Sequence, residues 1–176
     1  MIEDVLNGLK AKLDGNKIPA RIIKEDRPVL TVLFSPPETD SDIYGDIFFA
    51  TYGGDDFDNG LIVLQWEAAD ITGYSSAEHA NLCAGIAFLN TILPVGGYAV
   101  FNEEPEDDAE DNVPSKISLM YRIVLPVGKI GKKDWVIKEV YDAIETSAAV
   151  LKTTAGPLCG YAKGEVSTEE FRELLS

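Results

Sequence analysis

The chain has 176 residues, of which 45% are hydrophobic and 26% are charged. This length suits one domain, and the composition is close to that of folded globular domains, which argues against a disordered or membrane protein. The formal net charge is −15, from 30 acidic and 15 basic residues. Such a surface repels nucleic-acid phosphates, so we expect no nucleic-acid partner, and instead a protein or peptide partner, with basic ones favoured.

Cysteine usage and the first residues bear on location. Cys83 and Cys159 are the only cysteines, too few for a disulfide framework or a four-ligand zinc site, and we interpret both as reduced packing residues. The first residues include Glu3 and Asp4, where a signal peptide needs positive charge. No apolar run approaches the length of a membrane helix. We therefore expect a cytoplasmic protein that does not bind membranes.

In chain order, the first predicted element is a helix over about residues 2–14, because apolar residues recur there at helical spacing. Gly15 and Asn16 follow, and both tolerate a left-handed helix stop. From Ala20 to Glu67, short β-branched and aromatic runs alternate with turn residues, which predicts an antiparallel meander. Its clearest strands are Pro28–Phe34, Ile43–Tyr52 and Leu61–Trp66.

A second helix is predicted to begin at Ser75, because Ser75 and Glu78 have the spacing of a capping box, and Pro94 prevents its continuation. The runs 98–101 and 116–125 predict two strands, which we expect to form a hairpin around an acidic loop.

A third helix is predicted from apolar positions between Ile137 and Leu151, with a stop at Gly156-Pro157. Ser167 and Glu170 then cap a short last helix. The predicted fold class is α+β: a mostly antiparallel sheet with helices packed on it, in the order helix, several strands, helix, two strands, helix. No linker interrupts the chain, so we expect one domain over residues 1–176.

Ser75 is the best candidate for a catalytic residue, because it lies between a predicted strand and a predicted helix, as the nucleophile of a hydrolase does. The only histidine, His79, follows one helical turn later and cannot reach around the helix to activate Ser75. The helix cap explains Ser75 without catalysis. We therefore predict no catalytic residue and no enzyme, and a hydrolase of unrecognised type remains the alternative.

Cofactor and metal sites are also not indicated. The glycines form no nucleotide-binding motif, and the segment 55–60 has Phe57 where a calcium loop needs a ligand. Seven acids between Glu103 and Asp111 could bind divalent cations weakly or meet a basic partner, although runs of like charge are usually solvated. We predict no cofactor and no metal, and cation binding by residues 103–111 stays open as an alternative.

Aromatic and apolar residues fall on both faces of the predicted strands. Tyr44, Phe48 and Tyr52 share one face of a strand while Ile47 and Phe49 share the other. A sheet covered on both sides by helices would explain this pattern, and so would a sheet with one face open to a partner. The candidate partner surface is Tyr44, Phe48, Tyr52, Val63, Met120 and Val124.

The order of elements and one stretch of sequence resemble the bacterial YbjN family, which shares its fold with type III secretion chaperones. The stretch runs over residues 75–152, from Phe88-Leu89-Asn90 at a helix end, through a glycine turn and a strand, to Tyr121–Val127 and the third helix. The resemblance implies a small acidic protein that binds other proteins and pairs with itself as a homodimer. We therefore expect a non-enzymatic protein-binding or chaperone-like module.

Overall fold

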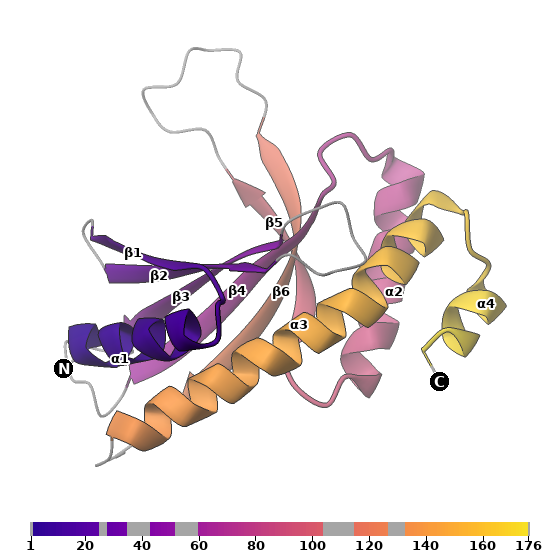
Figure 1. Ribbon diagram of the computed structural model, residues 1–176. Coiled ribbons are helices and arrows are strands. Elements are labelled where there is room, and N and C mark those ends of the chain that lie inside the picture. Colours follow the sequence, from indigo (N-terminus) through magenta and orange to yellow (C-terminus); the bar gives the residue numbers. More distant parts are fainter. Residues whose placement is uncertain are drawn as a thin grey trace. The chain divides into compact units, whose positions relative to one another are not determined.

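A computed structural model describes residues 2–24, 28–34, 43–51, 60–103, 115–126 and 133–175. The fold class is α+β, as predicted, with six strands in one antiparallel sheet of order β1-β2-β3-β4-β6-β5 (Figure 1). No described helix combines the length and the hydropathy that a membrane crossing requires. The elements are α1 (Ile2–Gly15), β1 (Ala20–Lys24), β2 (Pro28–Phe34), β3 (Ile43–Thr51), β4 (Gly60–Asp70), α2 (Ser76–Ile92), β5 (Gly97–Glu103), β6 (Lys116–Pro126), α3 (Lys133–Lys163) and α4 (Thr168–Glu173).

The chain divides into two compact units. Unit 1 comprises Met1–Trp66 and Arg122–Ala149, and unit 2 comprises Glu67–Tyr121 and Val150–Ser176. Strands β4 and β6 and helix α3 each contribute residues to both units. The prediction of one cooperative domain over residues 1–176 stays a prediction.

The core of unit 1 forms between one face of its strands and two helices. Alternate strand residues on this face are buried, as the two-residue period of a strand requires. Helix α1 contributes a stripe at helical spacing, and Lys12 on α1 lies over the ring of Tyr141 on α3, so both helices lie on the same side of the strands. The side chains that form this core include Leu6, Leu9, Leu13, Leu30, Val32, Ile47, Ile62, Leu64, Trp66, Val140 and Ile144.

Trp66 is fully buried and requires a glycine beside it. The register of β3 and β4 places Gly45 directly opposite Trp66. A side-chain carbon on Gly45 would overlap the six-membered ring of the indole. The indole therefore occupies the space that any other residue at position 45 would fill, and the two positions are sterically linked.

Unit 2 is built around the packing of α2 on the second half of α3. Gly85 lets Leu158 and Tyr161 approach the α2 backbone, and the amide of Asn81 donates to the carbonyl of Ala162 at 3.3 Å. Phe171 on α4 stacks on Tyr161 with ring centroids 4.7 Å apart. The predicted short last helix is thus anchored by one buried aromatic side chain.

The predicted end of the third helix is wrong, and so is the residue predicted for the left-handed stop after the first. Helix α3 does not stop at Gly156-Pro157 but continues to Lys163 with Pro157 inside it. Pro157 removes one hydrogen bond of the helix, but Leu158 and Ala162 beyond it are fully buried, and their burial offsets that loss. At the end of α1, the left-handed residue is Lys17, with φ of 60°, rather than Gly15 or Asn16.

The two cysteines are free thiols, as expected, but they differ in burial. Cys159 on α3 is half-buried, which fits a packing role. Cys83 lies exposed on α2 because the apolar stripe of that helix is formed by Leu82, Gly85 and Leu89. Its predicted role as a packing residue is therefore wrong.

Candidate binding surface

The face of the unit 1 sheet away from its helices carries a row of polar side chains that crosses five strands. The strand register places Arg21, Thr31, Asp46 and Gln65 side by side on β1 to β4. The hydroxyl of Thr31 donates to Asp46 Oδ1 at 2.7 Å. The guanidinium of Arg122 on β6 donates to Gln65 Oε1, from Nε at 3.1 Å and also from Nη2, and this completes the row.

A second, apolar row runs beside the polar row on the same face. Ile23, Val29, Phe48 and Val63 are neighbours in the same register, two residues along each strand from the polar row. Val124 continues this row on β6, because β4 and β6 are antiparallel and Gln65 meets Arg122. We call these two rows the two-row face: Arg21, Ile23, Val29, Thr31, Asp46, Phe48, Val63, Gln65, Arg122 and Val124.

Exposure varies along the apolar row and is highest at Val124 on β6. Phe48 is half-buried and Val63 is only 6% exposed, whereas Val124 is 47% exposed. Tyr44, which lies on the far side of the polar row opposite Leu33, is 57% exposed. Exposed apolar side chains that gather on one face of a sheet supply apolar area that a second protein can cover.

The structure thus brings together four residues of the predicted partner surface in unit 1: Tyr44, Phe48, Val63 and Val124. Val63 is buried, so it packs beside Phe48 on the neighbouring strand rather than offering contact area. Met120 is half-buried and belongs to unit 2, and Tyr52 lies outside the described residues.

The charge of the two-row face differs from that of the chain. Its ionisable side chains are Arg21, Asp46 and Arg122, a formal charge of +1, although the whole chain carries −15. This contrast is not visible in the sequence, because the polar residues are scattered between positions 21 and 122. Only the pairing register, which is not encoded by local pattern, brings them into one row.

A small apolar pocket of about 120 Å³ lies on the helix side of unit 1. It is lined by side chains from the ends of β4 and β6 and from the first turns of α3, including Ile62, Leu125, Trp135 and Val140. Sites for small molecules and cofactors typically have volumes of about 300–1,000 Å³. This pocket is smaller than such sites, and the sequence contained no signal for it.

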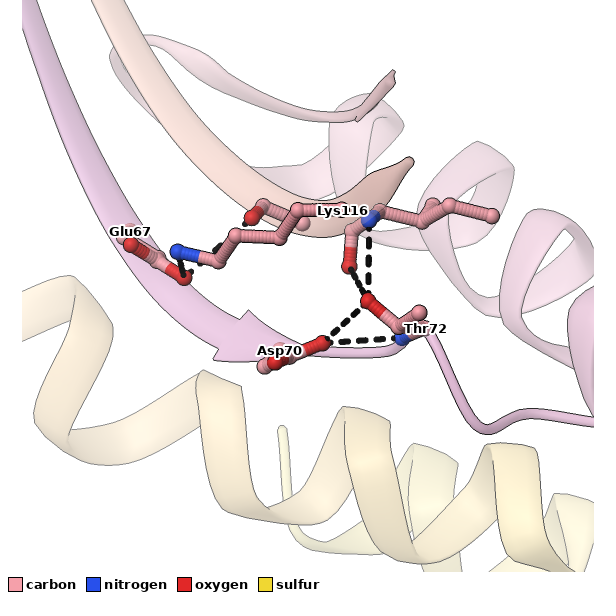
Figure 2. A network of polar contacts seen from close by, with 6 residues as sticks. Glu67, Asp70, Thr72 and Lys116 are labelled. Carbon is pink, nitrogen blue, oxygen red and sulfur yellow. Dashed lines mark hydrogen bonds and ion pairs between the residues drawn. The ribbon is translucent and has the colours of Figure 1, made fainter. Parts of the chain in front are cut away.

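A network of polar side chains joins β4 to β6 in unit 2 (Figure 2). Lys116 Nζ forms an ion pair with Glu67 Oε1 at 2.6 Å. The hydroxyl of Thr72 donates to Asp70 Oδ1 at 2.6 Å and accepts the backbone N–H of Ile117 at 2.9 Å. Hydrogen bonds from the Thr72 side chain and backbone lower the pKa of the Asp70 carboxyl. Because Thr72 is held by both partners, the network acts as a clamp between strands rather than as a nucleophile with its base.

Ser75 acts as a helix cap, as predicted. Its hydroxyl accepts the backbone N–H of Glu78 at 3.3 Å, and the Glu78 carboxylate accepts the backbone N–H of Ser75 at 2.6 Å. The ring of His79 lies 6.0 Å from that of Tyr74, centroid to centroid. These contacts give Ser75 a structural role.

The described residues contain no group of three or more histidine, cysteine, aspartate or glutamate side chains that could hold a metal ion. Of the acidic stretch 103–111, only Glu103 is described, at the exposed end of β5. Cation binding by that stretch therefore stays an untested alternative. Comparison of the chain with protein-family models, with curated proteins and with solved structures finds no match.

Proposed function

We propose that this chain is a non-enzymatic, chaperone-like protein-binding module, and that two copies pair through the two-row face of unit 1. The observation that carries the proposal is the exposure of Val124 and Tyr44 on a sheet face opposite the one on which α1 and α3 pack. Burial of such side chains against a second protein is favourable by about 25 cal/mol for each Å² of apolar surface removed from water.

Electrostatics favours a second copy as the occupant of this face. Two chains of −15 repel one another over most of their surface. The two-row face is the exception, because Arg21 and Arg122 outnumber Asp46 on it. When two such faces meet about a two-fold axis, each contact is made twice, and arginines of one copy can approach the aspartate of the other.

The resemblance to the YbjN family supports the same proposal, since it implies protein binding and self-association. We further propose that the protein is bacterial and cytoplasmic, a location in which the free thiols of Cys83 and Cys159 stay reduced. The clamp around Thr72 and the cap at Ser75 account for the polar groups that would otherwise suggest an enzyme.

Sedimentation equilibrium tests the pairing. Val124→Lys and Tyr44→Lys change side chains that are exposed in the single chain, so both variants should fold like the parent. We expect the parent to be a dimer and each variant to have a dimer dissociation constant raised at least about ten-fold. Leu174→Ser, which changes a 60% exposed side chain in unit 2, is the matched control and should leave the dimer intact.

A parent chain that stays monomeric at every concentration would contradict the pairing. So would a dimer that is unaffected by both lysine substitutions. If the parent is monomeric but an acidic protein from the host protects Val124 from solvent, the face binds a different partner and the self-pairing must be abandoned.

A further inference from the structure

Strand β5 is the last strand of the described sheet, and its outer half is unusually exposed. Tyr98 is buried, but every residue from Ala99 to Glu103 is exposed, on both faces of the strand. Val100 and Phe101 point to opposite faces and are each 41% exposed. A strand at a sheet edge normally hides apolar side chains on at least one face or is blunted by charge.

The side chain of Asn90 shows which backbone groups of β5 point away from β6. Its carbonyl oxygen accepts the backbone N–H of Tyr98 at 2.8 Å, and its amide donates to the carbonyl of Tyr98 at 3.0 Å. The N–H and C=O of one residue in an antiparallel strand point to the same side, and successive residues alternate. The backbone groups of Tyr98, Val100 and Asn102 therefore point away from β6. Those of Ala99 and Phe101 point toward β6.

Asn90 thus takes the place of a neighbouring strand at Tyr98 and at no later residue. The next outward positions are Val100 and Asn102, and in the part of the chain that the structure describes no strand lies beyond them. An edge with outward backbone groups and apolar side chains on both faces is a template for an added strand.

We propose that the outer edge of β5 from Val100 to Asn102 binds a basic, extended segment of a partner protein as an added strand. This inference rests on the proposed protein-binding function. It adds a second binding place, in unit 2, and states the chemistry of the partner that binds there. The segment pairs its backbone with Val100 and Asn102. Its central apolar side chains cover Val100 on one face and Phe101 on the other.

The charge of unit 2 determines the sign of the segment. Unit 2 contains 14 acidic and 4 basic residues, a formal charge of −10, whereas unit 1 carries −5. Glu103 lies exposed at the end of β5, and Lys116, the basic residue of β6 in unit 2, is engaged by Glu67. A second β5 would bring two units of −10 together, so a lysine- or arginine-rich segment is favoured over a second copy.

Fluorescence anisotropy with a labelled synthetic peptide tests the edge on the full chain. The probe is the capped peptide KKVIVKR, and EEVIVEE is its charge-reversed match. We expect KKVIVKR to bind and EEVIVEE not to, with affinity for KKVIVKR falling as salt is added. A KKVIVKR peptide that is N-methylated at all three central residues should lose at least about ten-fold in affinity, because neither of its edges then carries the N–H groups that pair with β5.

Val100→Pro is the matching change in the protein. It removes an outward N–H but no hydrogen bond between β5 and β6, a position where sheets tolerate proline. We expect at least about a ten-fold loss of affinity for KKVIVKR, whereas Val100→Thr, which keeps the N–H, should retain most of it. If Val100→Pro fails to fold, the comparison of methylated and unmethylated peptides still decides the question.

Equal affinity for the two oppositely charged peptides, or an affinity that methylation of the peptide leaves unchanged, would overturn the proposal. The chain with Val124→Lys separates it from the proposed pairing: KKVIVKR should bind that variant as tightly as the parent. If Val100→Pro instead dissociates a dimer and KKVIVKR does not bind, β5 is a contact between copies and the basic segment is excluded.

Discussion

The side chain of Asn90 satisfies two backbone groups at the start of β5. Its amide pairs with both backbone groups of Tyr98, a residue that is only 3% exposed. Asn90→Ala would leave both groups without that partner, and we expect a loss of about 1–3 kcal/mol in the free energy of unfolding. Denaturant titration measures this loss. Thr91→Ala, the exposed neighbour on α2, is the control, and an equal loss there would mean that the pairing with Tyr98 contributes nothing.

Asp70 makes the stability of the chain depend on pH. Its folded pKa is lowered by the hydrogen bonds from Thr72, so its contribution is present above the unfolded pKa of about 3.9 and is lost as pH falls through the lower folded value. Asp70→Asn keeps an acceptor for Thr72 but does not titrate. We expect the stability difference between parent and variant to be larger at neutral pH than under strongly acidic conditions. An unchanged difference, from denaturant melts at both pH values, would contradict this.

At the scale of elements, α3 offers a test that depends on sign. Gly156 lies inside the helix, and apart from its two chain neighbours and the nearby helix backbone, a side-chain carbon there would meet no atom within 4 Å. Gly156→Ala should therefore raise the free energy of unfolding through helix propensity, by less than about 1 kcal/mol because the ring of Pro157 restricts the residue before it. If the helix ended at Gly156 in solution, as the sequence predicts, alanine would be neutral or destabilising there. Thermal or denaturant melts measure the sign directly.

The elements that local sequence specifies were predicted well. Ser75 with Glu78 and Ser167 with Glu170 each satisfy a helix start within four residues, so pattern was sufficient, and both capping boxes are present. Pro157 was misjudged because the burial of Leu158 lies outside any local pattern.

The candidate surface could be predicted only in part, because it too depends on residues that are distant in the sequence. Strand periodicity puts Tyr44 and Phe48 on one face, but it does not determine which face the helices cover. The pairing of Asn90 with Tyr98 and the row from Arg21 to Arg122 depend on which segments become neighbours, and no spacing rule gives that information.

At the scale of the whole molecule, we expect the two units to unfold together, because β4, β6 and α3 each supply residues to both. Trp66 and Trp135 belong to unit 1, so tryptophan fluorescence reports on that unit. Leu158→Ala removes a fully buried side chain from unit 2 and should cost about 2–5 kcal/mol. If the two units unfold together, Leu158→Ala shifts the midpoint of unfolding by the same amount whether tryptophan fluorescence or circular dichroism is followed. A fluorescence midpoint that does not move would show independent units.

The steric link between Gly45 and Trp66 has a consequence for evolution. Because the indole fills the space of any side chain at position 45, Gly45 can change only where Trp66 has become smaller. Chains that descend from the same ancestor should keep glycine at the first site wherever the second is a large aromatic, and should lose that glycine only where the aromatic has been lost. This dependence between positions 45 and 66, on two different strands, would identify distant relatives whose remaining residues have diverged.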